Sequence, residues 1–276
     1  MALSNATVTP IPEAGSVIGV DVGFSPKRRS SAVCRLDWTA SRIDISVGRY
    51  RSIEPERTEV LSRMVDRPII AAAFDGPLRS DLEVIGMYRH AELMLTRRLQ
   101  PFIGKPGQSS APTGKLLNHN ANICAKIVID TGVLAAATHR RAIHGSAIAE
   151  AFPSSFLGLM IMDPKGLQAS RGNRSDSFYI HLAASGGLNR LLEYLLPSRE
   201  LAVPFDAIKN HDERAAVVCA LTALCIAVGE YTAVGDHNGW IILPPPSFIQ
   251  QWAWKELSVN AQENEGLEWL GFRPAH

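Results

Sequence analysis

The stretch that decides the fold is Ser16-Val-Ile-Gly-Val-Asp-Val-Gly23, in which a run of apolar residues ends at a single carboxylate, Asp21. A short apolar run of this kind predicts a buried strand. A charge at the end of such a run costs several kcal/mol unless it is paired or binds a metal. Gly23 leaves room for a ligand or a second backbone segment to come close. The stretch therefore predicts either a functional carboxylate at a strand end or a turn cap.

The same construction, an acid at the end of an apolar element, occurs three more times. The apolar run 69–74 ends at Asp75, and a short predicted strand that begins at Ala147 ends near Glu150. Asp212 lies at the start of the longest predicted helix, where Asn210 or Asp212 itself is a natural N-cap. Taken singly, each acid has a structural explanation as a turn cap, a strand-end residue or a helix cap.

Taken together, the four acids predict a metal centre. Two carboxylates about 4 Å apart repel each other by roughly 4 kcal/mol at an effective dielectric constant of about 20, so converging acids need a counter-charge. Mg²⁺ and Mn²⁺ prefer carboxylate oxygens, and two such ions about 4 Å apart support phosphodiester cleavage. The candidate catalytic residues and metal ligands are Asp21, Asp75, Glu150 and Asp212.

The composition describes an ordinary globular protein. The chain has 276 residues, of which 46% are hydrophobic and 20% are charged. We expect a flexible N-terminal arm over residues 1–15 and one domain over residues 16–276. The net charge of +1 favours no polyanionic partner, so a nucleic acid would have to meet a local basic patch. Candidates for phosphate contacts are Arg89 and the trio 27–29, although a solvated basic loop is the simpler explanation of the trio.

Cysteine spacing and hydropathy bear on the compartment. The four cysteines show no paired spacing, which argues against a zinc site or a disulfide framework and suits a reducing cytoplasm. Residues 1–15 lack the basic start and apolar run of a signal peptide. The longest apolar run, Ala215 to Val228, falls short of the roughly 20 residues of a membrane span. We therefore expect a cytoplasmic protein that does not enter a membrane, with this run as a buried core helix.

The first part of the chain predicts strand, strand, strand, helix, strand. Residues 31–36 and 43–47 have strand patterns with short connections, so with the first strand they form an antiparallel meander. A helix opens at Pro55, and the apolar run before Asp75 follows it. Helical stretches dominate residues 86–145, and Trp240 to Leu243 is the last predicted strand.

In this order, the motifs resemble the ribonuclease H-like superfamily. More closely, the chain resembles the domain-of-unknown-function 429 family, whose members are described as predicted nucleases. The resemblance implies an α/β fold with a ribonuclease H-like mixed five-stranded sheet flanked by helices, a helical insertion around residues 86–145 and an acidic metal centre. The segments that carry it are 18–23, 74–78, 150–157, 211–223 and 239–244.

One departure concerns the last acid. The family pattern has an Asp-Ala pair one turn inside the last helix, where this chain has Ala215-Ala216. Asp212 lies three residues earlier on the same helix face and is the candidate substitute. The resemblance thus implies a nuclease dependent on Mg²⁺ or Mn²⁺ that acts on nucleic acid.

Two other classes of function stay open. The near-neutral charge and the departure at Ala215 favour a non-catalytic binding or scaffold protein that has kept the fold and lost the chemistry. A nucleotide-binding phosphotransferase of the actin and sugar-kinase type shares the first strand pattern. That class requires a second half and a second glycine-rich phosphate loop, and the sequence contains only one half.

Overall fold

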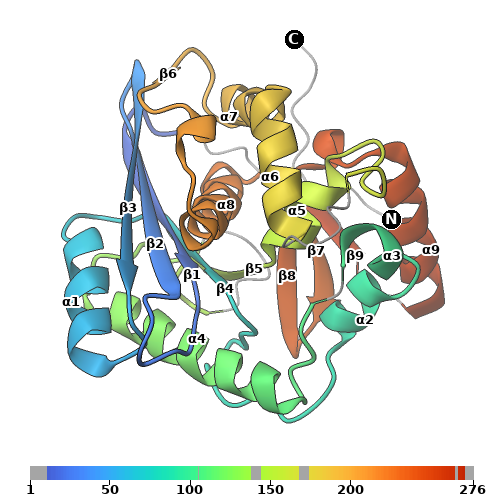
Figure 1. Ribbon diagram of the computed structural model, residues 1–276, viewed down its shortest axis with the longest axis horizontal. Helices are drawn as coiled ribbons and strands as arrows, with labels where there is room; N and C mark the ends of the chain where they lie inside the picture. The colour runs from blue at the N-terminus through green and yellow to red at the C-terminus, as the bar shows by residue number, and fades with distance from the viewer. Residues whose placement is uncertain (1–10, 105, 138–143, 168–173, 265–266, 271–276) are drawn as a thin grey trace.

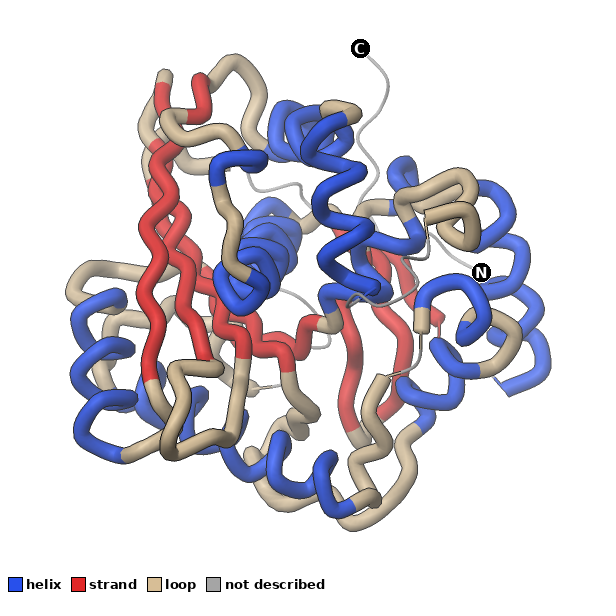
Figure 2. Tube along the Cα trace, in the orientation of Figure 1, coloured by secondary structure: helices blue, strands red, loops and turns tan. Residues whose placement is uncertain are grey.

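The fold is built on one mixed β-sheet with helices on both faces (Figures 1 and 2). The computed structural model describes residues 11–104, 106–137, 144–167, 174–264 and 267–270. Over these ranges the sheet has nine strands, of which β6 has only two residues, in the order β6-β3-β2-β1-β4-β5-β8-β7-β9. The prediction of five strands is therefore wrong, whereas the mixed α/β architecture is confirmed. The strands are β1 Gly15–Asp21, β2 Ser31–Trp38, β3 Arg42–Tyr50, β4 Ala71–Asp75, β5 Ile148–Ala151, β6 Glu200–Leu201, β7 Tyr231–Asp236, β8 Gly239–Leu243 and β9 Leu267–Leu270.

Strand directions divide the sheet into a parallel centre and flanks that are antiparallel except at one edge, where β6 pairs in parallel with β3. β1, β4, β5 and β8 run parallel to one another, β2 is antiparallel to both β1 and β3, and β7 is antiparallel to β8 and β9. The predicted meander of the first three strands is thus confirmed. β7 and β9 were not expected from the sequence; they extend the sheet beyond β8.

Helix α8 is the central element of one face. It is almost entirely buried and packs across β1, β2 and β4, with α5, α6 and α7 around it (Figure 1). Its apolar run is the core helix that the sequence predicts. None of the helices in the described ranges combines the length and the apolar character that a bilayer span requires. The helices are α1 Glu54–Met64, α2 His90–Thr96, α3 Gln100–Ile103, α4 Pro112–Asp130, α5 Pro153–Leu159, α6 Arg174–Ala184, α7 Gly187–Leu195, α8 His211–Val228 and α9 Gln251–Asn264.

A missing side chain on β1 brings α8 close to the sheet. A Cβ atom at Gly19 would lie 2.0 Å from the Ala220 nitrogen and 2.4 Å from the Ala216 carbonyl oxygen. Only glycine permits this approach of helix backbone to strand. Because side chains alternate along a strand, the position of Gly19 also shows that Val17 and Asp21 lie on the α8 face.

The opposite face is covered by α1 and α4. A Cβ at Gly48 on β3 would meet Met64 and Val60 of α1, and one at Gly76 after β4 would meet Ala121 of α4. Helices α2, α3 and α4 all lie within the predicted helical segment 86–145. A smaller apolar cluster forms where α2 and α9 pack near β7 and β8.

The start of the chain is attached to the sheet next to β1. Residues 1–10 of the predicted N-terminal arm lie outside the described residues. Beyond them, the Trp38 indole Nε1 donates a hydrogen bond to the Pro12 carbonyl at 3.0 Å. β1 begins three residues later, so this hydrogen bond from β2 holds the segment that leads into β1.

Candidate functional site

Two predicted site residues are direct neighbours at one edge of the sheet. Asp21 ends β1, Asp75 ends β4, and these strands are parallel with Asp21 opposite Asp75. Residues opposite each other in a sheet point to the same face, and Asp21 lies on the α8 face. The structure therefore brings the first two predicted acids together on the side of the sheet that α8 covers.

Asp212 reaches the same edge from the first turn of α8. The helix begins after Asn210, whose side-chain oxygen accepts hydrogen bonds from the backbone N–H of Asp212 at 2.9 Å and of Glu213 at 3.2 Å. This is the N-cap that the sequence predicts, with Asn210 as the capping residue. Because Asn210 caps the helix, the Asp212 carboxylate is free to act elsewhere.

The electrostatics of the pair show how close these acids are. Burial raises the pKa of Asp21 well above its usual value, and the nearby Asp75 and Asp212 raise it further, with Arg49 acting in the opposite direction. Burial also raises the pKa of Asp75 to about 7, with a second contribution from Glu150. Near neutral pH the pair therefore retains protons that ordinary carboxyls have released, unless a cation replaces them.

Arg49 on β3 provides the positive charge at this site. Its Nη2 lies 2.8 Å from the Asp212 Oδ2, and the Arg49 and Asp212 side chains are 34% and 17% exposed. The same guanidinium donates to the Arg29 carbonyl in the loop after β1. Sequence reasoning missed Arg49, which lies 163 residues before Asp212.

Glu150, the remaining predicted ligand, is turned to the other face of the sheet. Its partner on β4 is Phe74, one residue before Asp75, so the Glu150 side chain leaves the sheet opposite to that of Asp75. There Arg89 binds it with both terminal nitrogens, Nη1 to Oε2 at 2.7 Å and Nη2 to Oε1 at 2.8 Å. The Leu78 N–H also donates to Oε2 at 2.9 Å. Glu150 is thus part of a buried ion pair and not of the acidic group at the sheet edge.

Arg89 consequently does not serve as the phosphate contact considered from the sequence. It is 1% exposed, and its Nε donates to Glu92 Oε1 at 2.9 Å. The Ser109 hydroxyl and N–H donate to the same carboxylate. This network joins α2 and the loop before α4 to β5. Burial raises the pKa of Glu150 even though Arg89 opposes the shift, as expected for one arginine shared between two buried acids.

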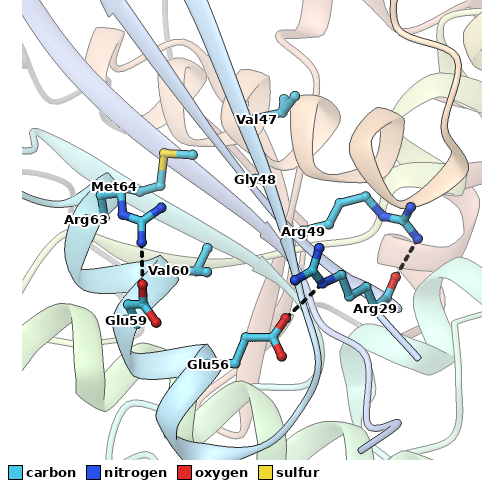
Figure 3. A pocket seen from close by; sticks show the side chains of 9 residues that line it. All are labelled: Arg29, Val47, Gly48, Arg49, Glu56, Glu59, Val60, Arg63 and Met64. Carbon is cyan, nitrogen blue, oxygen red and sulfur yellow. Dashed lines mark hydrogen bonds and ion pairs between the residues drawn. The ribbon is translucent and has the colours of Figure 1, made fainter. Parts of the chain in front are cut away.

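A pocket of about 340 Å³ lies between β3 and α1, beside this edge (Figure 3). Arg29, Arg49 and Arg63 come from three different elements to line it. Arg29 Nε lies 2.9 Å from Glu56, and Arg63 pairs with Glu59 along α1. Its apolar wall consists of Val47, Gly48, Val60 and Met64.

The donor set fits a hard cation with a small number of protein ligands. Within the described ranges no group of three or more His, Cys, Asp or Glu side chains is arranged to hold a metal ion. Asp21 and Asp75 nevertheless present two facing carboxylates, and no hydrogen bond or ion pair to either side chain occurs among the described residues. Mg²⁺ is commonly held by one or two carboxylates together with water and substrate phosphates. A site of that kind fits the pair, whereas a cage of four carboxylates does not form.

Comparisons with protein-family models, with curated proteins and with solved structures give no match. The chemistry of this edge therefore has to be judged from its own residues.

Proposed function

We propose that this chain is a metal-dependent phosphodiesterase that acts on nucleic acid, with Asp21 and Asp75 holding Mg²⁺ or Mn²⁺. The observation that carries the proposal is the direct pairing of Asp21 with Asp75 at the ends of adjacent parallel strands. Ligands of open α/β sheets bind outside the carboxyl ends of the strands, where this pair lies. Two facing carboxylates with raised pKa values gain most from a divalent cation in that place.

The topology supports the ribonuclease H-like assignment on which the proposal draws. Strands β1 to β5 form a five-stranded mixed unit by themselves, in the order β3-β2-β1-β4-β5. The three antiparallel strands come first in the chain, and the two following strands add in parallel beside β1. We assign β6 to β9 to extensions of this unit.

Each residue of the site has a role in the proposed reaction. Asp21 and Asp75 bind the cation, which supplies an acidified water and charge stabilisation for the leaving oxygen. Asp212 is the third carboxylate beside the pair, and its ion pair with Arg49 places it there. Glu150 and Arg89 position the loop that follows β4, because Glu150 accepts from Leu78, three residues after Asp75.

The decisive experiment is cleavage of labelled single-stranded DNA, duplex DNA, single-stranded RNA and an RNA–DNA hybrid with and without Mn²⁺. We expect cleavage of at least one substrate with Mn²⁺, none with EDTA, and none by the Asp21→Asn and Asp75→Asn variants. Asp130→Asn, an exposed acid at the far end of α4, is the matched control and should retain activity. Absence of cleavage on all four substrates, or full activity of Asp21→Asn, would contradict the proposal.

One observation favours a non-catalytic binding protein as the second candidate. The Asp212 carboxylate is already neutralised by Arg49, and no third acidic ligand completes the pair within the described ranges. Calorimetry with Mn²⁺ at pH 8 separates the two functions, because a scaffold that has lost its chemistry should bind no ion. The phosphotransferase alternative has less support, since the described residues after α8 form only the three strands β7, β8 and β9, too few for a second copy of the five-stranded unit.

A further inference from the structure

The loop between β1 and β2 carries three consecutive cations beside the acidic pair. Lys27, Arg28 and Arg29 are all exposed, and the loop begins directly after the strand that Asp21 ends. The end of β3 lies next to the start of β2, because Tyr50 is paired with Ser31. Arg51, which follows Tyr50, therefore lies near the β1–β2 loop at the same edge of the sheet. We refer to Lys27, Arg28, Arg29 and Arg51 as the basic ridge.

The backbone under the basic ridge is fixed by four hydrogen bonds of ordinary length. The Ser31 hydroxyl accepts from the Gly23 N–H at 3.0 Å, and the Ser52 hydroxyl donates to the Gly23 carbonyl at 2.8 Å. The Ser52 N–H donates to the Ser25 carbonyl at 3.0 Å, and the Ser25 hydroxyl accepts from the Arg28 N–H at 3.1 Å. A loop held in this way presents its side chains from a defined place, which lowers the entropy cost of binding.

The charges of the basic ridge are only partly compensated. Glu56 is shared between Arg29, at 2.9 Å, and Arg51, at 2.5 Å. Among the described residues, Lys27 and Arg28 have no carboxylate partner within ion-pair distance. The surface thus concentrates positive charge in a chain whose net charge is only +1. This is the local basic patch that a polyanionic partner of a nearly neutral protein requires.

We propose that the basic ridge binds the sugar–phosphate backbone of a nucleic acid strand and leads it to the Asp21–Asp75 pair. The inference rests on the proposed function for its ligand class, and it adds the surface by which that ligand is held. The exposed cations contact phosphates, so binding is independent of base sequence and sensitive to salt. The acidic pair itself offers no positive charge to a phosphate, so the ridge supplies most of the affinity in a buffer without divalent cations.

The test measures binding without allowing cleavage. A fluorescent 20-nucleotide single strand is titrated in EDTA at several salt concentrations, with wild type, the double variant Lys27→Ala/Arg28→Ala and the control Arg42→Ala/Arg67→Ala. Arg42, the first residue of β3, and Arg67, which precedes β4, are also exposed and lie at the opposite end of the sheet, where they pair with Asp44 and Asp66. A plot of the logarithm of the association constant against the logarithm of the salt concentration has a negative slope. Loss of two phosphate contacts should make this slope shallower by roughly 1.4 and weaken binding on the order of tenfold at 0.1 M salt.

Each outcome decides for or against the ridge. An unchanged slope in the ridge variant, an equal loss in the control, or no detectable binding by wild type would overturn it. Both double variants are first checked by circular dichroism and by melting temperature. The comparison is valid when both agree with wild type. If the ridge variant shows the predicted change in slope but wild type never cleaves with Mn²⁺, the proposed function fails and the ridge stands. If cleavage occurs and the ridge variant binds like wild type, the ridge fails and the function stands.

Discussion

Asp21 and Asp75 stand opposite each other on neighbouring parallel strands, each as the last residue of its strand. Neighbouring strands are about 4.8 Å apart, so the two side chains leave the sheet next to each other for as long as the ladder is intact. The sheet therefore imposes a repulsion that a proton or a cation has to remove. This relationship determines how stability and metal binding should depend on pH.

Replacing Asp75 with Asn should stabilise the protein at high pH in the absence of divalent ions. The pKa of Asp75 is raised from 3.8 to about 7, so between these values the folded state holds a proton that the unfolded chain has released. The contribution of protonated Asp75 to the free energy of unfolding is complete below pH 3.8 and is lost as the pH rises through 7. At pH 8 the variant should exceed wild type by about 2–4 kcal/mol in urea unfolding, and at pH 4 the two should agree. Equal stability at pH 8 would show that the pair is not strained, and Asp130→Asn provides the baseline.

Replacing Arg49 with Gln should tighten Mn²⁺ binding at pH 8 about fivefold. The change releases Asp212 from a partly exposed ion pair, which contributes about 1 kcal/mol at most. Calorimetry of the variant against Arg63→Gln, which alters another arginine of the same pocket, isolates this effect. Weaker binding by Arg49→Gln would mean that Arg49 positions Asp212 for the ion and does not compete with it.

The Glu150–Arg89 pair should affect folding and leave metal binding unchanged. Arg89→Leu leaves Glu92 and Glu150 buried without a cation and should cost about 3–5 kcal/mol in chemical unfolding. Glu150→Gln should lower stability by less while its Mn²⁺ affinity equals that of wild type. A loss of Mn²⁺ binding by Glu150→Gln without a loss of stability would identify Glu150 as a ligand after all.

A methyl group at Gly19 should push α8 away from the sheet. The added Cβ would overlap the Ala220 nitrogen, and overpacking of this kind costs about 1–3 kcal/mol or more. Gly86→Ala is the control, because no atom lies within 4 Å of its added Cβ. Differential scanning calorimetry should show a lower melting temperature for Gly19→Ala only. Equal melting temperatures would mean that helix and strand can move apart without cost.

The elements with strong local patterns are those that could be predicted from the sequence. The apolar runs before Asp21 and Asp75 form β1 and β4, and the run after Asn210 forms α8 with the expected cap. Local chemistry is sufficient in these cases, because burial and capping act on neighbouring residues. It did not reveal β7, although Asn238-Gly239 is a hairpin signal that implies a strand on each side of the turn.

The membership of the site depends on register, which local patterns do not determine. Glu150 follows the same pattern as Asp75, yet it pairs with Phe74, and a shift of one residue moves a side chain to the other face. Arg49 has no local signal, since its partner Asp212 comes from a helix far along the chain. Asp21 and Asp75 face each other because both end neighbouring strands, and Asp212 adjoins them because α8 begins at the same edge. Glu150 lies on the opposite face because of its register with β4, which becomes visible only when the strands are paired.

The close approach of α8 to β1 at Gly19 has a consequence for ion selection. Helix backbone this close to strand backbone cannot yield by rotating side chains, so the spacing between α8 and β1 is set in advance. If a divalent cation binds at Asp21 and Asp75 as proposed, elements that cannot move apart should favour the smaller Mg²⁺ over the larger Ca²⁺.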